Sequence, residues 1–121
     1  MFKAVIISES LKHPSWLNDC KKLDVYVHEY AETPEAPIWH LFKVEVPDEQ
    51  VEPARRAVEE NIKYGWYAHF FNGEIVHVCF EGRSFTIPQE EKWSSPEFQT
   101  MKDYAVSHGV EEKYLDIDTR P

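Results

Sequence analysis

The chain has 121 residues, a formal net charge of −9 and a hydrophobic fraction of 42%. This length fits one domain, residues 1–121, whose core needs neither disulfides nor a structural metal, and the composition excludes general disorder. The acidic charge is not offset by any cluster of Lys and Arg, so we expect no nucleic-acid partner.

The two cysteines, Cys20 and Cys79, lie far apart and have no CxxC spacing. This usage favours a reducing compartment over a disulfide framework. The apolar run over residues 2–7 is too short for a signal peptide, and the sequence has no run of about 18 apolar residues. We therefore expect a cytoplasmic protein with no membrane partner.

The first half of the chain predicts three strands and two helices. Residues 2–8 are mostly apolar, as in a buried strand, and His13-Pro14-Ser15 opens a brief helix that ends at Lys21-Lys22. Alternating polarity predicts strands over 23–32 and 38–46, separated by a loop over 33–37. Apolar residues at three- and four-residue spacing predict a helix over 47–63, which either begins near Pro53 or is kinked there.

Residues 65–87 predict a three-stranded meander, because Asn72-Gly73 and Glu81-Gly82 each supply a two-residue turn. Counting outward from the first turn pairs Phe71 with Glu74 and His69 with Val76, and the second turn pairs Phe80 with Arg83 and Val78 with Phe85. One face is then apolar and core-forming, with Tyr67, His69, Phe71, Val76, Val78, Phe80, Phe85 and Ile87. The opposite face carries Trp66, Ala68, Phe70, Ile75, His77, Cys79, Ser84 and Thr86.

The C-terminal part predicts one more helix and a partly anchored tail. Ser95 is a suitable N-cap before Pro96, and Gly109 ends the helix with Val110 as the apolar residue that folds back. In the acidic tail, Leu115 and Ile117 are expected to pin the chain to the core, together with Tyr114.

The order of elements predicts an α+β fold, a ferredoxin-like βαββαβ sandwich with an antiparallel meander extension and a C-terminal helix. In this arrangement the first two predicted helices cover one sheet face. They are expected to lie over Val25, Val27, Phe42, Val44, Val46 and the apolar face of the meander. The outer sheet face is then expected to collect Tyr26, His28, Tyr30, Trp39, Leu41, Trp66, Phe70 and His77. So many apolar residues on an open face indicate an interface or a binding groove.

The run GWYAHFFNG is followed by a V-x-F-x-G strand and by a closing helix that ends in Gly109-Val110 and leads to Tyr114-Leu115-Asp116. This second half of the chain is similar to conserved hypothetical proteins of bacteria and archaea that have no assigned activity. The resemblance implies a small prokaryotic domain, and it implies no catalytic residues.

The histidines on predicted strands divide between two faces, with His40 and His69 toward the core and His28 and His77 outward. No H-x-H, HExxH or Cys/His spacing is present, so we predict no transition-metal site and no cofactor. Cys79 lies two residues from His77, too far along a strand for direct activation, and is expected to be structural. Tyr67 and His69 could form an acid/base pair, although their core-facing positions favour packing.

Two functions remain open. The first is a non-catalytic interaction module that docks an identical chain, as a homodimer, or a partner protein on the outer face formed by Tyr26, His28, Tyr30, Trp39, Trp66, Phe70 and His77. The second is a small-molecule site or an enzyme on the same face, with His28 or His77 as acid/base. A concave pocket favours the second function, and a flat occluded patch favours the first.

Overall fold

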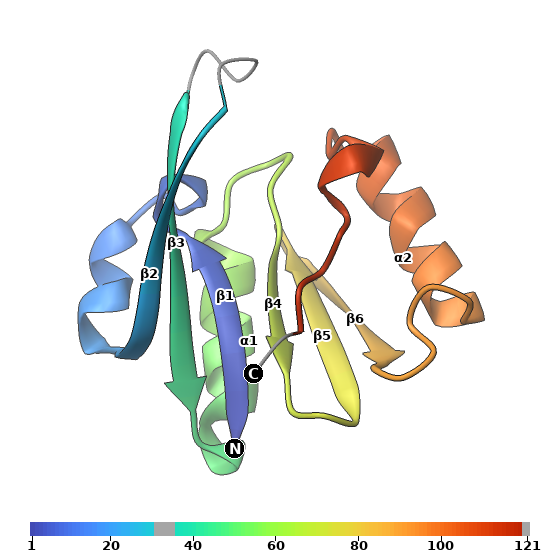
Figure 1. Cartoon of the computed structure of the whole chain (residues 1–121), viewed down its shortest axis with the longest axis horizontal. Coiled ribbons are helices and arrows are strands. Elements are labelled where there is room, and N and C mark those ends of the chain that lie inside the picture. Colours follow the sequence, from blue (N-terminus) through green and yellow to red (C-terminus); the bar gives the residue numbers. More distant parts are fainter. Residues whose placement is uncertain (31–35, 120–121) are drawn as a thin grey trace.

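The computed structural model describes residues 1–30 and 36–119, which form an α+β fold around one antiparallel sheet (Figure 1). Within these residues the sheet has six strands in the order β2-β3-β1-β4-β5-β6. The strands are β1 Phe2–Ile7, β2 Lys21–Glu29, β3 Ile38–Val46, β4 Ala68–Phe71, β5 Ile75–Phe80 and β6 Arg83–Pro88. The helices are α1 Val51–Asn61 and α2 Pro96–Ser107, with short 3-10 turns at η1 Ser8–Ser10, η2 Pro14–Asp19, η3 Asp48–Gln50 and η4 Glu112–Tyr114. The predicted end of the second strand and most of the loop after it lie outside the described residues.

Helix α1 covers one face of the sheet. The strands alternate along their length, so Ala4 and Ile6 of β1 and Val44 of β3 point toward α1 and are fully buried. Phe70 of β4 and Cys79 of β5 belong to the same cluster. Trp16 and Leu17 of the turn η2 also pack into this cluster, so the first connection and α1 share one side of the sheet.

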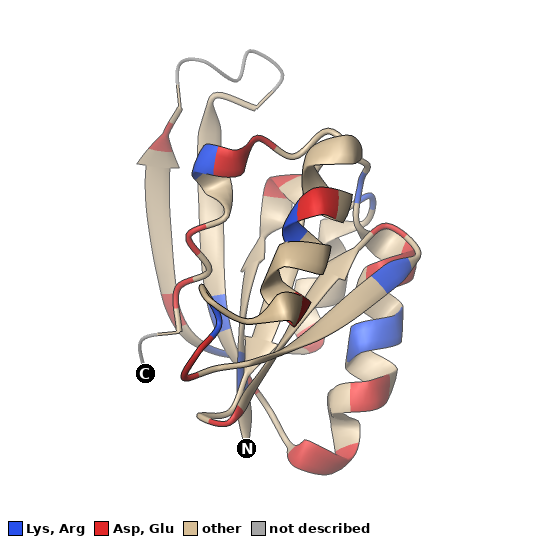
Figure 2. Ribbon diagram, turned by 90° about the vertical axis from the view of Figure 1, so that its right-hand side faces the viewer, with Lys and Arg blue, Asp and Glu red and all other residues tan. Residues whose placement is uncertain are grey.

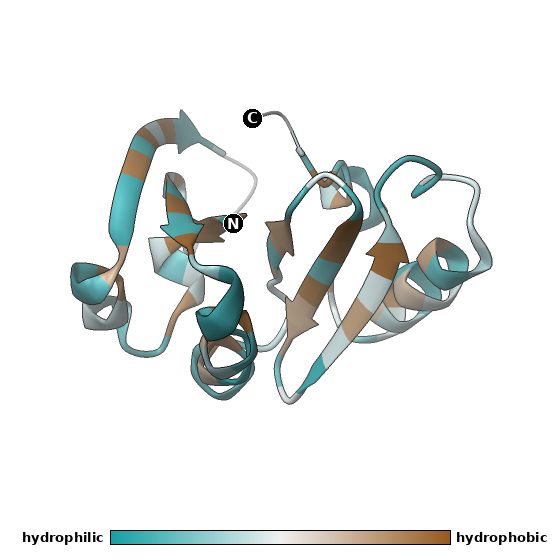
Figure 3. Cartoon of the chain, turned by 90° about the horizontal axis from the view of Figure 1, so that it is seen from below, coloured by the Kyte–Doolittle hydropathy of each residue, from teal (hydrophilic) through white to brown (hydrophobic). Residues whose placement is uncertain are grey.

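Helix α2 covers the opposite face, and only over the second half of the sheet (Figure 3). Its buried residues Phe98, Met101 and Ala105 pack on Val76 and Val78 of β5. The segment after α2 adds Val110, Leu115 and Ile117 to this second cluster, as the sequence predicted for the tail. The described residues therefore form two apolar clusters, one on each side of β4 and β5.

The prediction that the apolar face of the meander lies under the first two helices is wrong, because Val76 and Val78 pack beneath α2. Val25 and Val27, expected under the helices, are 45% and 60% exposed. Both faces of the meander are apolar because α1 covers one and α2 covers the other. The sequence of the meander therefore has no polar face from which the buried side of the sheet could be predicted.

The meander is present, with one correction to its register. Phe80 pairs with Arg83 and Val78 with Phe85, as predicted. At the first turn, however, Phe71 pairs with Val76 and His69 with Val78, two residues away from the predicted register. The turn is longer because Oδ1 of Asn72 accepts from the backbone N–H groups of Glu74 and Ile75, and a shift of two leaves every side chain on its face.

The ends of both helices follow from local chemistry. α1 begins at Val51, so Pro53 lies in the first turn, where its missing N–H costs no helical hydrogen bond. Oγ of Ser95 accepts from the N–H of Phe98 at 3.1 Å and caps α2. Gly109 has φ of 87°, and the N–H of Val110 donates back to the carbonyl of Ala105 at 3.0 Å, as expected for a glycine C-cap.

Replacing Ser95 with alanine is expected to lower the free energy of unfolding by about 1 kcal/mol, because the N–H of Phe98 loses its acceptor in a buried position. Urea denaturation followed by circular dichroism measures the loss. Ser94→Ala is the matched control, because the Ser94 hydroxyl does not cap α2 and contacts only the carbonyl of Glu91 at 3.4 Å. Equal effects of the two substitutions would contradict the capping role.

Candidate functional site

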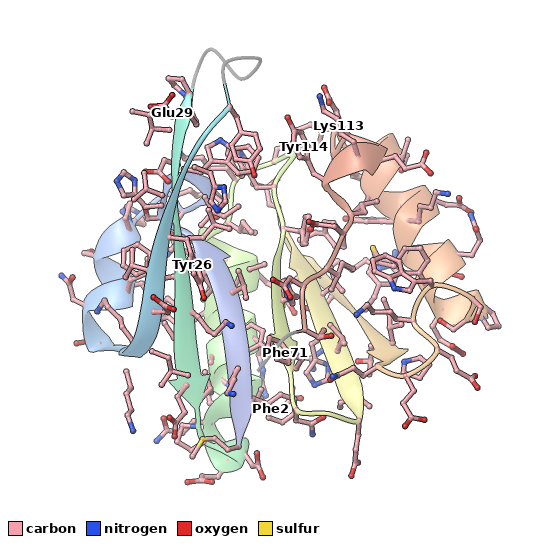
Figure 4. The ribbon with its side chains drawn as sticks, in the orientation of Figure 1. Phe2, Tyr26, Glu29, Phe71, Lys113 and Tyr114 are labelled. Atoms are coloured by element: carbon pink, nitrogen blue, oxygen red, sulfur yellow. The ribbon has the colours of Figure 1, made fainter. Side chains whose placement is uncertain are left out.

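A groove lies on the half of the sheet that α2 leaves uncovered. Its volume is about 990 Å³, at the upper end of the range of small-molecule sites. Strands β1, β2, β3 and β4 contribute to it, and so do the loop before β4 and the segment after α2. In Figure 4 the labelled Tyr26 comes from β2 and Tyr114 from the C-terminal side of the groove.

The floor of the groove is mostly apolar, with Lys43 of β3 as a charged member. Val5 and Ile7 of β1 and Leu41 of β3 line it, and all three are only partly buried. Their faces are fixed by the antiparallel register, which pairs Ile7 with Leu41 and Val5 with Lys43. In an antiparallel sheet the face that no helix covers usually carries polar side chains. An uncovered apolar floor at this place indicates a surface that accommodates another molecule.

An aromatic cluster forms one end of the groove. The indole ring of Trp39 is 7% exposed and lies at its centre, with ring centroids 3.9 Å from Tyr30, 4.9 Å from Trp66 and 5.3 Å from Tyr114. Nε1 of Trp39 donates to the carbonyl of Ala36 at 2.8 Å, which fixes the indole plane. The cluster therefore presents a rigid aromatic wall to the groove.

The other wall is the C-terminal segment, which two side chains of the 67–69 stretch hold in place. The hydroxyl of Tyr67 donates to the carbonyl of Tyr114, and Nε2 of His69 donates to the carbonyl of Asp118 at 2.7 Å. Because Tyr67 and His69 are two residues apart on one face, both bonds point to the same segment. Burial, followed by the charge of Asp116, raises the pKa of Tyr67 well above its usual value, so this phenol stays protonated.

His69 is neutral and has a defined tautomer. Burial lowers its pKa below the usual value, against the opposing effects of the Asp118 carbonyl and the charges of Asp118 and Asp116. A carbonyl only accepts, so the proton is on Nε2 and Nδ1 keeps a lone pair. The described residues provide no donor for Nδ1, although the side chain of His69 is almost fully buried and lines the groove. His69 can therefore accept a hydrogen bond from a bound molecule.

The groove brings together five of the seven predicted site residues: Tyr26, His28, Tyr30, Trp39 and Trp66. Phe70 and His77 are not among them. Phe70 is fully buried in the cluster under α1, and His77 stacks on Phe2 at 5.7 Å with Nδ1 2.9 Å from Oγ1 of Thr86. The prediction that these two residues lie on the aromatic face is wrong. The side chains of β4 alternate in the opposite sense to the predicted one, so His69 faces the groove together with Tyr26 of β2, and Phe70 faces α1.

The predicted faces of the histidines are wrong for the same reason. His28 and His69 both line the groove, while His40 is on the other side of β3, where its Nδ1 lies 2.6 Å from Oε2 of Glu9. Over residues 1–30 and 36–119, no three His, Cys, Asp or Glu side chains converge as a metal site would require. Burial raises the pKa of the Cys79 thiol to about 12, so this cysteine is a thiol inside the core and not an activated nucleophile.

Sequence reasoning missed the part of the groove built by the C-terminal segment. It treated Tyr67 and His69 as core residues and Asp116 and Asp118 as tail, whereas all four line the groove. The usable signal was the pair of polar side chains at alternate positions on an otherwise apolar face, since buried Tyr and His require hydrogen-bond partners. Figure 2 shows the other acidic residues spread over α1, the loops and the C-terminal segment.

Comparisons with protein-family models, with curated proteins and with solved structures gave no match to this chain. The helices of the described residues are all too short or too polar to cross a membrane.

The buried histidines predict a loss of stability in mild acid. Burial lowers the pKa values of His69 and His77, and unfolding returns both imidazoles to about 6.5. Below that pH the unfolded state binds more protons than the folded state, so the free energy of unfolding is largest above about pH 6.5 and falls as the pH decreases toward 5. Urea denaturation across this range measures the slope. We expect His69→Gln to reduce the slope and Val106→Gln, which removes no titrating group at an exposed position, to leave it unchanged; equal slopes in all three proteins would contradict the assignment.

Proposed function

We propose that the protein binds a small molecule in the groove between the β2–β3 hairpin and the C-terminal segment. The observation that carries this proposal is the apolar floor of Val5, Ile7 and Leu41, which lies on interior strands and is not covered by a helix. A cavity of about 990 Å³ is concave, and concavity distinguishes a ligand site from a flat docking face.

The lining favours a planar aromatic ligand that carries an N–H or O–H donor. Trp39 and its neighbouring rings offer faces for stacking, and Val5 and Ile7 offer an apolar bed. The lone pair on Nδ1 of His69 is the acceptor that orients such a donor. If the site is catalytic, His69 and His28 are the candidate bases, because both line the groove and His77 does not.

Docking of an identical chain or partner protein directly on the aromatic face is the less supported function. Trp39 is already buried by its own neighbours, and the residues around it line a hollow. A protein surface that filled this volume would have to insert a side chain or a loop.

The first test uses indole as the probe and heteronuclear NMR as the measurement. Titration to millimolar indole is expected to shift the backbone amide signals of Val5, Ile7 and His69, which lie along the groove. Ile7→Trp should abolish these shifts because the larger side chain occupies the floor. Val106→Trp is the matched control, since Val106 is exposed on α2 and outside the groove. Absence of shifts in the wild-type protein, or their persistence in folded Ile7→Trp, would overturn the proposal.

The second test concerns the hydrogen bond to His69. N-methylindole has nearly the same shape as indole but no donor, so it is expected to bind about 5-fold more weakly, which corresponds to roughly 1 kcal/mol for one net hydrogen bond. In His69→Phe the difference between the two probes should disappear. Equal affinities in the wild-type protein would reject His69 as the acceptor and leave the aromatic groove itself intact as a site.

We also propose that β1, η2, β2, β3, α1 and β4 correspond to the ferredoxin-like βαββαβ arrangement. The spatial order β2-β3-β1-β4 with antiparallel neighbours supports this correspondence, as does the packing of η2 and α1 into one cluster. A six-residue 3-10 turn stands where the first α-helix of that arrangement would be, and β5, β6 and α2 extend the sheet beyond it.

A further inference from the structure

Strand β2 is the outermost strand on one side of the sheet and is uncovered along its whole length. All nine of its residues are exposed, whereas β6 at the other edge has Ile87 buried and contacts α2. An edge strand of this length offers unpaired backbone N–H and C=O groups to another strand. In Figure 1 the turn η2, which leads into β2, lies beside the start of the strand, and the strand's nine residues are nevertheless all exposed.

The face of β2 that turns away from the groove carries an apolar row. Leu23, Val25 and Val27 are 41%, 45% and 60% exposed. Figure 3 shows this as brown bands that alternate with teal along the strand. Three exposed branched side chains in a row are unusual for an edge strand, which normally carries charges that prevent pairing. The row fits a partner strand with apolar residues at matching positions.

The charges of β2 make the strand complementary to a second copy of itself. Lys21 and Lys22 lie at its start, where Nζ of Lys21 is 3.4 Å from Oε2 of Glu45 and Nζ of Lys22 donates to the carbonyl of Leu17 at 2.7 Å, and Glu29 lies at its end. Two copies in antiparallel orientation place the lysines of one chain near Glu29 of the other, whereas parallel copies would place like charges together. We propose that a second copy of this chain pairs with β2 in antiparallel orientation about Val25, forming a homodimer with one continuous sheet.

The register follows from the apolar row. With Val25 opposite Val25 of the second copy, Val27 lies opposite Leu23, so the two rows form one apolar ladder. The register shift between Lys22 and Asp24 lies at the end of this ladder, so regular backbone pairing spans Asp24 to Tyr26 and the contact of Leu23 with Val27 is made by side chains alone. The two-fold axis runs through the sheet, so both grooves open on the same side, with Tyr26 of each chain next to the junction.

Asp24 limits the strength of this pairing. Its Oδ1 accepts from the N–H of Val25 at 2.9 Å and so covers one backbone group at the centre of the proposed interface. A partner strand has to compete with this bond. The pairing is therefore expected to be reversible and to depend on protein concentration.

Sedimentation velocity of the full chain from micromolar to millimolar concentration tests the proposal. A dimer is expected to appear with rising concentration, to be lost in Val25→Lys, and to be tightened several-fold by Asp24→Ala, which frees the N–H of Val25. Val106→Lys, which adds the same charge at an exposed site far from β2, should leave the dimer unchanged. Circular dichroism confirms that each variant is folded.

A wild-type protein that stays monomeric at millimolar concentration would overturn the proposal, and so would a dimer that persists in Val25→Lys. An unchanged dissociation constant in Asp24→Ala would exclude pairing through the backbone at Val25. Because Val25 lies outside the groove, monomeric Val25→Lys should still bind indole, so a failure of the dimer can be distinguished from a failure of the proposed ligand site.

Discussion

Replacing Phe70 with alanine is expected to lower the free energy of unfolding by about 3–5 kcal/mol, the cost of removing a large aromatic side chain from a packed core. Phe70 has no exposed surface and packs in the cluster beneath α1, beside Ala68 and Cys79. Equilibrium urea denaturation measures this loss. Against a typical domain stability of about 5–15 kcal/mol, such a change leaves the variant barely folded at best.

Tyr26→Ala is the control for this prediction, because the sequence assigned Tyr26 and Phe70 to one aromatic face. Tyr26 is 42% exposed on β2, so its removal should cost less than about 1 kcal/mol. If the two substitutions had similar effects, the placement of Phe70 under α1 and of Tyr26 at the groove would be wrong.

Replacing Ile117 with alanine is expected to cost about 2–4 kcal/mol and to release the wall of the groove. Ile117 is 1% exposed in the cluster beneath α2, although its φ of 28° is unfavourable for a β-branched residue. The packing of its side chain has to hold this strained backbone. On either side of it, Asp116 and Asp118 line the groove, and the carbonyl of Asp118 accepts from His69.

Two measurements separate the global effect from the local one. Urea denaturation gives the loss of stability, and hydrogen exchange at residues 114–118 reports whether the segment has come away from the sheet. Val106→Ala, an exposed position on α2, should change neither by more than about 0.5 kcal/mol. Full protection of the segment in Ile117→Ala would show that Tyr67 and His69 suffice to hold it.

The proposed dimer and the proposed ligand groove share β2. Tyr26 and His28 face the groove, while Val25 and Val27 on the other side of the same strand form the proposed dimer ladder. Pairing of two β2 strands would fix the hairpin that forms one wall of each groove. Ligand affinity is therefore expected to rise at protein concentrations at which the dimer forms, and an indole titration at two protein concentrations measures this effect.

Local features of the structure were determined by the sequence itself. The strand over 38–46 has the predicted bounds, the serine cap at Ser95 and the glycine C-cap at Gly109 form as expected, and Val78 pairs with Phe85. These features depend on turn chemistry and on periodicity within about ten residues, which the sequence contains directly. The aromatic character of the Tyr26, Tyr30 and Trp39 region also follows from alternation along two neighbouring strands.

The relation between distant strands was decided only by the tertiary structure. The parity of β4 relative to β2 depends on the pairing of Val5 with His69 and with Lys43, which joins segments more than 25 residues apart. Apolar residues occupy both faces of the meander because α1 covers one and α2 the other, so periodicity gave no preference. The C-terminal segment became a wall of the groove through the bonds from Tyr67 and His69. Such long-range contacts form only after the chain has closed large loops, and no local pattern encodes which face they join.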